Sequence, residues 1–270
     1  MGKEIDYIFA INTGRSGSDY LNKIFEHVSG CRSFHEPDPV GNGKVMRRYS
    51  RGKTNPMKRL AEQKAGIAKK LKLDCQIYFE SNHCFIKGFG WFIPQYLPED
   101  RIGVIILKRD KSKIVESYRR VRTSPLSRKG RRWISTPDMI NPLVTPPRIL
   151  ITYQGARFIK NVLRLPEYLI KKVFKKKFQS PQWLVNYETE CLKWYVDETY
   201  AKAEVFKQQY PAIKYYEVNI EDLNTLESVQ QLLTHFGCKG GGTLKEVVGR
   251  PTNLKRPRSD TSQRNPTPNL

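Results

Sequence analysis

The sequence predicts an α/β fold in which helices flank a central parallel sheet. Strand-sized apolar segments recur along the chain, helical segments with one apolar face alternate with them, and glycine or proline turns separate the two kinds of segment. Parallel neighbours need a long crossover connection, which is usually a helix, so this alternation favours parallel pairing. The length of 270 residues suits one domain spanning 1–270.

The first predicted elements are a strand over 7–11 and a helix over 18–28, joined by a glycine-containing turn. A short strand over 31–34 follows. It ends in the sequence His-Glu-Pro-Asp-Pro at 35–39, where two prolines hold the backbone extended and take the chain out of the sheet as a loop.

The middle of the chain continues the alternation. The pattern predicts a helix over 56–72, a strand over 75–80, a second strand over 101–107 and a helix over 111–121. The strand over 101–107 contains the run Val-Ile-Ile-Leu, which is typical of a strand that is buried on both faces.

An irregular segment interrupts this alternation between residues 123 and 183. It is basic and rich in proline, and it mixes loops with short helices such as 156–163. We expect it to form a cap over the sheet that binds the acceptor substrate, inserted within the single domain. Regular elements resume with a helix over 186–209, a strand over 213–218 and a helix over 226–236, before a basic tail rich in glycine and proline.

Positive charge is the most unusual feature of the composition. There are 48 Lys and Arg against 26 Asp and Glu, a formal net charge of +22. Eleven of the basic residues lie between Lys108 and Arg132, where the only acids are Asp110 and Glu116. An anionic ligand is therefore expected here. Zinc-finger spacing, a heptad zipper and RNP-like aromatic motifs are absent from the sequence, so we expect no nucleic-acid partner.

Other classes of site are disfavoured by residue counts and spacing. No apolar run approaches the roughly 18 residues of a membrane helix, and an acidic N-terminus does not fit a signal peptide, so we expect a cytoplasmic protein without a membrane partner. The oligomeric state is not indicated. Neither a disulfide framework nor a metal site is expected, because the cysteines and histidines are scattered (Cys31, Cys75, Cys84, Cys191 and Cys238; His27, His35, His83 and His235).

The turn after the first strand has the features of a phosphate-binding loop. The run from Thr13 to Ser18 (TGRSGS) stands between a parallel strand and a helix, so backbone N–H groups and the positive end of the helix converge there. Arg15 and the hydroxyls of Ser16 and Ser18 add further groups suited to phosphate. The Walker A pattern is absent because Ser18, and not Lys, follows Gly17. A magnesium-triphosphate site is thus disfavoured.

A second phosphate-binding group follows the strand over 101–107. Arg109 comes directly after this strand, and Ser117 lies two turns into the next helix. The guanidinium of Arg109 can bind a phosphate in bidentate fashion while the hydroxyl of Ser117 donates to the same group.

Together these two motifs resemble the sulfotransferase family, which has a P-loop-like fold and uses 3′-phosphoadenosine 5′-phosphosulfate (PAPS) as donor. The loop from Gly14 to Ser18 is similar to the family's 5′-phosphosulfate loop, and Arg109 with Ser117 is similar to its 3′-phosphate motif. Weaker similarity extends to Glu221-Asp222-Leu223 and to Gly249 with the following C-terminal loop. The resemblance implies PAPS as donor, 3′-phosphoadenosine 5′-phosphate (PAP) as product, no metal, and a cofactor site made of Gly14, Arg15, Ser16, Gly17, Ser18, Asp19, Tyr20, Arg109, Ser117, Asn253 and Lys255.

One position departs from the family pattern. Asp19 stands where Thr or Ser is common in the family, which places a carboxylate beside the expected anion site. It either faces the cofactor, which weakens binding, or points away as an acidic residue in the first turn of a helix, where the helix dipole favours it.

The resemblance also implies catalytic roles. Arg15 is expected to stabilise charge on the leaving phosphate. For the general base we expect Glu36, with His83 as the alternative. Glu36 resembles the base of several carbohydrate and protein sulfotransferases, and His83 resembles that of the small-molecule enzymes. The ordinary pKa of an imidazole suits a base, whereas nearby positive charge lowers the pKa of a carboxyl group.

The acceptor is expected to be the hydroxyl or amine of a small metabolite such as a natural product, with a carbohydrate or glycan as the alternative. Two functions from other classes stay open. A P-loop kinase or nucleotide hydrolase would share the topology, but this sequence lacks the lysine that such enzymes have after the second glycine of the loop. A basic nucleic-acid-binding protein would account for the positive charge but not for the two motifs.

Overall fold

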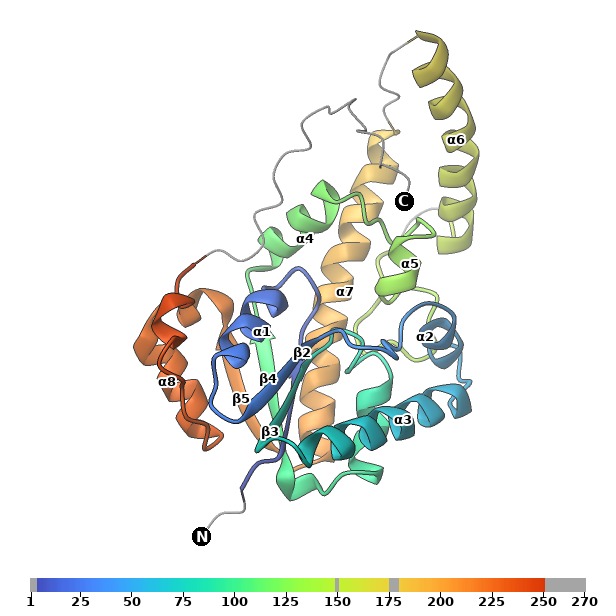
Figure 1. Cartoon of the computed structure of the whole chain (residues 1–270). Helices are drawn as coiled ribbons and strands as arrows, with labels where there is room; N and C mark the ends of the chain where they lie inside the picture. The colour runs from blue at the N-terminus through green and yellow to red at the C-terminus, as the bar shows by residue number, and fades with distance from the viewer. Residues whose placement is uncertain (1–3, 149–150, 175–179, 251–270) are drawn as a thin grey trace, which may run out of the picture.

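The computed structural model describes residues 4–148, 151–174 and 180–250. Its centre is a five-stranded sheet of order β2-β3-β1-β4-β5 in which every neighbouring pair is parallel (Figure 1). The predicted α/β class and parallel sheet are confirmed. The strands are β1 (Tyr7–Ile11), β2 (Cys31–His35), β3 (Ile77–Ser81), β4 (Ile102–Lys108) and β5 (Lys214–Asn219).

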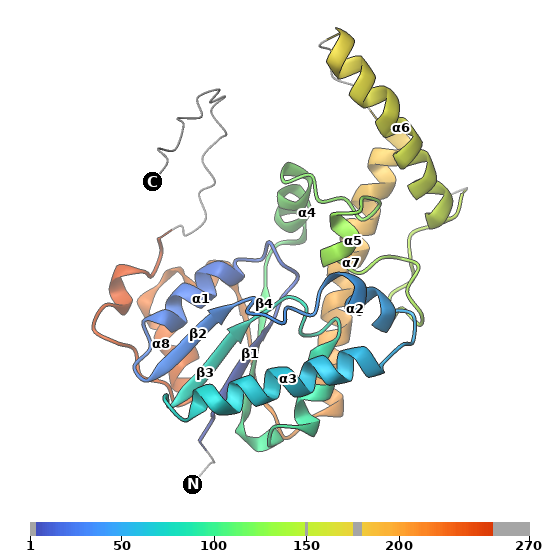
Figure 2. The same cartoon turned by 45° about the vertical axis from the view of Figure 1, so that its right-hand side comes forward.

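Helices cover both faces of the sheet (Figures 1 and 2). The α-helices are α1 (Ser18–Glu26), α2 (Gly43–Tyr49), α3 (Asn55–Lys72), α4 (Lys111–Arg120), α5 (Gly130–Trp133), α6 (Tyr153–Phe174), α7 (Gln182–Gln209) and α8 (Leu226–His235). Short 3₁₀ helices are η1 (Phe89–Gln95), η2 (Glu99–Arg101), η3 (Ile220–Asn224) and η4 (Leu244–Glu246).

Alternation along β1 divides the core into two layers. Phe9 and Ile11 pack in the layer with α3, η1 and the C-terminal half of α7, whereas Ile8 and Ala10 pack in the layer with α1 and α8. All five residues of β1 are buried, as expected of a central strand covered on both faces.

The directions of the connections place a crevice at one edge of the sheet. From β1 the chain runs through α1 toward the β2 edge, and from β4 it runs through α4 and onward to the β5 edge. The loops after β1 and β4 therefore diverge, and open α/β sheets bind ligands at such a point. The predicted phosphate loop and Arg109 follow these two strands.

Three helical segments differ from the sequence prediction. Helix α2 lies in a stretch that we predicted to be a loop. Helix α7 begins at Gln182, four residues before the predicted start. Helix α6 runs from Tyr153 to Phe174 and includes Pro166, whereas we predicted a short helix over 156–163. A proline removes one helical hydrogen bond, but good helix formers on both sides can continue the helix through it.

The state of the thiols and the polarity of the helices complete the description of the fold. All five cysteines are free, as their scattered positions predicted. Within the described ranges, each helix is too short or too polar to cross a lipid bilayer.

A buried ion pair supports the β3 side of the crevice. Lys64 on α3 donates to Glu80 on β3 at 2.6 Å, and both side chains are at most 3% exposed. Lys64 also donates to the carbonyl of Pro37 at 3.2 Å, and the hydroxyl of Tyr78 donates to Glu80 at 2.8 Å. The pair therefore fixes the loop after β2 against the end of β3.

We predict that Lys64→Met lowers the free energy of unfolding by about 3 to 5 kcal/mol, because it leaves the carboxylate of Glu80 buried without its cation. Adding Glu80→Gln in the same chain should recover more than half of that loss, since the uncompensated charge is then gone. Urea unfolding of the two variants and the wild type measures both effects. A double variant as unstable as the single one would contradict this account.

Candidate active site

A cavity of about 510 Å³ opens at the carboxyl ends of β1, β2, β3 and β4. It brings together most of the residues that the sequence singled out from five separate segments of the chain. Its lining includes Gly14, Arg15, Gly17, Ser18, Asp19, Tyr20, His35, Glu36, His83, Arg109, Ser117, Tyr118, Arg120, Val121, Thr123, Lys129 and Trp133. Ser16 is in the loop but does not line the cavity, and its buried hydroxyl makes no hydrogen bond within the described residues.

Hydrogen bonds to the loop after β1 fix its conformation. The carbonyl oxygen of Thr13 accepts from the hydroxyls of Tyr118 on α4 and Tyr195 on α7, each at 2.6 Å. The backbone N–H of Gly14 donates to Asn12 Oδ1 at 2.9 Å, and the backbone of Gly14 has a φ of +69°. A Cβ on Gly14 would lie 2.6 Å from the Tyr118 hydroxyl, so only glycine allows this approach.

The two predicted phosphate-binding groups form one cluster. Arg15 Nε donates to Ser117 Oγ at 3.0 Å, and Arg109 Nη1 donates to the backbone carbonyl of Arg15 at 2.9 Å. Arg15 also has a φ of +60°, a conformation that costs energy in a residue other than glycine and that recurs at functional sites. Both arginines and one hydroxyl thus meet at the crevice between β1 and β4.

Of the C-terminal residues that resemble the family, Glu221 to Leu223 and Gly249 lie within the described residues. Arg109 Nε lies 3.8 Å from the carboxylate of Glu221, which also forms an ion pair with Lys113 at 3.1 Å. The segment after β5 therefore contacts a residue of the candidate site. The hydroxyl of Tyr20 donates to the carbonyl of Leu223 at 2.9 Å and accepts from the N–H of Gly249 at 2.7 Å.

Two expectations about the rim have different outcomes. Asp19 lines the cavity and lies in the first turn of α1, so both features that we weighed for this position are present. Asn253 and Lys255 lie outside the described residues.

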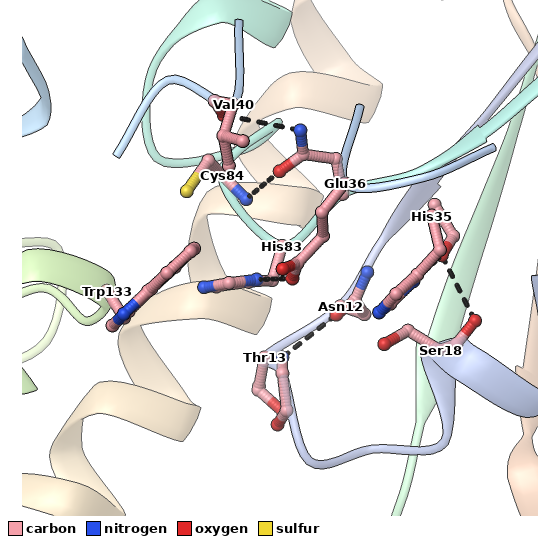
Figure 3. A network of polar contacts seen from close by, with 12 residues as sticks. Asn12, Thr13, Ser18, His35, Glu36, Val40, His83, Cys84 and Trp133 are labelled. Carbon is pink, nitrogen blue, oxygen red and sulfur yellow. Dashed lines mark hydrogen bonds and ion pairs between the residues drawn. The ribbon is translucent and has the colours of Figure 1, made fainter. Parts of the chain in front are cut away.

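The two candidate bases are hydrogen-bonded to each other. Glu36 follows β2 and His83 follows β3, and these strands are neighbours. Because a carboxylate only accepts, His83 Nδ1 carries the proton and donates to Glu36 Oε1. Figure 3 shows the His83 ring between Glu36 and Trp133. Nε2, the other ring nitrogen, is buried and has no hydrogen-bond partner within the described part of the chain.

Local charges set the ionisation of this pair. Burial alone would raise the pKa of Glu36, but the hydrogen bond and charge of His83 outweigh it and lower the pKa to about 2. Burial and the nearby charge of Lys87 hold the pKa of His83 below its ordinary value, although the Glu36 carboxylate opposes them. At neutral pH the pair is therefore an ionised carboxylate beside a neutral imidazole with a free lone pair on Nε2.

The backbone at Glu36 is held in an unusual conformation. Its φ is +49°, and its N–H donates to the carbonyl of Ser81 at 3.0 Å. Two hydrogen bonds hold the residues that follow. The Lys64 ammonium donates to the carbonyl of Pro37, and the Asn82 amide donates to the carbonyl of Val40 at 3.2 Å. The prolines at 37 and 39 alone did not indicate this network.

Sequence reasoning missed several lining residues, among them Trp133, and it also missed Lys87, which does not line the cavity but is hydrogen-bonded to Trp133. The Lys87 ammonium, which is buried, donates to the carbonyl of Trp133 at 2.6 Å and to the hydroxyl of Tyr195 at 3.0 Å. Burial lowers its pKa to about 8. The indole of Trp133 lies 5.4 Å from the His83 ring, centroid to centroid. Neither residue belongs to a motif, so no local signal pointed to it.

Comparison with known proteins adds no family assignment: no protein-family model matches the chain, and no curated protein sequence matches it either. The resemblance to sulfotransferases therefore stays a prediction that rests on the residues and their geometry.

We predict that Glu36→Gln lowers the pKa of His83 further, because it removes the negative charge that favours the imidazolium. Lys87→Met should move the same pKa upward, since it removes a neighbouring positive charge. Nitrogen-detected NMR titration of the His83 ring in each folded variant measures both shifts. Shifts in the same direction in the two variants would contradict the electrostatic account.

Proposed function

We propose that this chain is a cytoplasmic PAPS-dependent sulfotransferase that transfers a sulfuryl group to a hydroxyl or amine of a small metabolite or a carbohydrate. One observation carries the proposal: Arg15, Arg109 and Ser117 meet in the same cavity as a histidine with a free, oriented lone pair. A phosphate-binding cluster beside a base is the arrangement that in-line group transfer needs.

The residues of the cavity fit the donor. The loop after β1 offers backbone N–H groups at the start of α1, and the two guanidiniums supply positive charge at the crevice. Arg109 and Ser117 would hold the 3′-phosphate. Arg15, with the loop, would hold the phosphate of the phosphosulfate group. When bound, the donor supplies an activated sulfuryl group with a phosphate as its leaving group.

The hydrogen bond between Arg15 and Ser117 refines these roles. Arg15 Nε lies 3.0 Å from Ser117 Oγ, so the Arg15 guanidinium points toward the residues that we assign to the 3′-phosphate. Arg15 could therefore contribute to donor binding as well as to stabilising the leaving phosphate, and the two effects separate kinetically. A purely binding role changes KM alone, whereas transition-state stabilisation lowers kcat.

The geometry favours His83 over Glu36 as the residue that removes the acceptor proton. Glu36 accepts the Nδ1 proton, which leaves Nε2 of His83 as the proton acceptor, and a carboxyl group with a pKa of about 2 is a poor base at neutral pH. Glu36 would then act by orienting the imidazole and by stabilising the positive charge that His83 gains. The order that we expected from the sequence is thus reversed in the proposal.

Thermal-shift measurements separate the proposed function from the alternatives. PAP should raise the melting temperature of the wild type without added metal, and magnesium-ATP and a short oligonucleotide should raise it much less. Stabilisation by magnesium-ATP alone would favour a kinase or hydrolase. Stabilisation by the oligonucleotide alone would favour a nucleic-acid-binding protein.

We predict that Arg109→Ala weakens PAP binding by about 1.5 to 3 kcal/mol, the range of a hydrogen bond to a charged group. Calorimetry on the folded variant measures this, and Arg128→Ala, an exposed arginine outside the cavity lining, is the matched control. Equal PAP affinity in the Arg109 variant and the wild type would remove the 3′-phosphate assignment.

We predict that His83→Ala lowers the single-turnover rate at saturating PAPS by about 10² to 10⁴, the usual cost of losing a general base. Glu36→Gln should cost less, because the glutamine oxygen can still accept the Nδ1 proton. Rapid-quench assays with an acceptor that the wild type sulfates measure both rates. If Glu36→Gln is inactive and His83→Ala retains most of its rate, Glu36 is the base.

A further inference from the structure

A second cavity, of about 290 Å³, adjoins the candidate active site. It lies between the end of α4, the segment that follows α4, and residues of α6 and α7. Thr123 lines both cavities, so the two spaces meet at that residue. Helices α4 and α7 contact each other, and both views show α4 beside α7 toward the end of the molecule from which α6 projects (Figures 1 and 2).

Uncompensated positive charge lines this second cavity. The guanidiniums of Arg119 and Arg122 make no hydrogen bond or ion pair within the described residues. The third cation, Lys160, lies 3.3 Å from Glu188, which also accepts from the Ser124 hydroxyl. Glu188 is the one carboxylate among the described residues of the lining, and it is already paired. Two positive charges therefore remain for a ligand.

The backbone at Arg122 is strained. Arg122 follows the last turn of α4, where its N–H donates to the carbonyl of Arg119 at 2.9 Å and the N–H of Thr123 donates to that of Tyr118 at 3.0 Å. This Schellman arrangement places Arg122 in the left-handed region, with a φ of +54°, where glycine is usual. An arginine in this conformation costs stability relative to glycine, and such residues cluster at functional sites.

The second cavity continues the part of the first that the donor does not use. Arg15, Arg109 and Ser117 are assigned to the donor phosphates, which leaves a wall made by the end of α4 and the segment through Trp133. Trp133 lies beside the His83 ring, and Thr123 in the same segment lines both cavities. Thr123, Ser127 and Thr189 also line this cavity. The hydroxyls of Ser127 and Thr189 donate to the backbone carbonyls of Ser124 and Val185, and a hydroxyl oxygen that donates can still accept a hydrogen bond.

We propose that the second cavity binds an anionic unit of an elongated acidic oligosaccharide while a hydroxyl of a neighbouring unit reaches His83. This inference rests on the proposed sulfotransferase function and assigns its acceptor class. The arginines suit carboxylate or sulfate groups, and the wall hydroxyls suit sugar hydroxyls. A nucleic acid is less favoured, because single strands bind along open grooves with aromatic rings for the bases, and the lining of this cavity holds no aromatic residue among those described.

Calorimetry with a defined probe tests the site. Hexagalacturonate and its fully methyl-esterified form have the same chain and differ in charge. At about 50 mM salt, where charge effects are strong, the acid should bind at least about tenfold more tightly than the ester. Arg119→Ala and Arg122→Ala should each weaken binding of the acid about three- to tenfold and leave the ester unchanged. Arg128→Ala removes the same charge from outside both cavities and should have little effect.

A glycine variant separates the ligand role from folding. Arg122→Gly should raise the melting temperature by about 1 to 3 °C, because it relieves the left-handed conformation, and should still weaken binding of hexagalacturonate as Arg122→Ala does. A more stable protein that binds less well cannot be explained by loss of structure.

Several results would overturn the proposal. These are equal binding of acid and ester, no detectable binding of the acid, an effect of Arg128→Ala as large as that of Arg122→Ala, or tighter binding of a thymidine hexanucleotide with the same dependence on the two arginines. Binding of PAP is measured on the same samples and should be unaffected by the Arg119 and Arg122 variants. If the wild type does not bind PAP, the sulfotransferase function fails, whereas arginine-dependent binding of the acid would still identify the cavity as an anion site.

Discussion

The carbonyl oxygen of Thr13 is the acceptor on which the candidate site depends. It begins the loop after β1, and the hydroxyls of Tyr118 on α4 and Tyr195 on α7 both donate to it. Leaving a buried hydroxyl without an acceptor costs free energy, so these bonds hold three elements that are distant in the sequence to one atom. Ser117 precedes Tyr118, and Lys87 donates both to Tyr195 and to the carbonyl of Trp133, so the same atom helps to position the Ser117 hydroxyl and the Trp133 side of the cavity.

The sheet and the cluster of Arg15, Arg109 and Ser117 could be predicted because their signals are local. A buried strand, a glycine turn and the start of a helix occupy one short stretch, and the position of Arg109 follows from where β4 ends. The carboxyl ends of parallel strands meet at one edge, so these groups were expected to be near one another. The length of α6 was not predictable in this way, because Pro166 is a helix-ending signal that the surrounding turns override.

The link between Glu36 and His83 could not be predicted, because it depends on which strands are neighbours. The two residues are 47 positions apart and meet only because β2 pairs with β3 and not with β1. Treated separately, each looked like a rival base. Lys87 and Trp133 could not be predicted for a related reason. Their roles come from contacts between segments that are distant in the sequence, and neither residue belongs to a sequence motif.

Under the proposed function, the shielding of His83 Nε2 would protect an activated donor from water. A base that solvent reached freely would activate water as readily as an acceptor and would waste the donor by hydrolysis. In this structure Nε2 is out of contact with solvent, with Trp133 beside the ring. Trp133 belongs to the segment after α4, and its carbonyl is held by Lys87. An acceptor that displaces the indole of Trp133 would expose the Nε2 lone pair only when the acceptor binds. Transfer to the acceptor would then be favoured over hydrolysis of the donor.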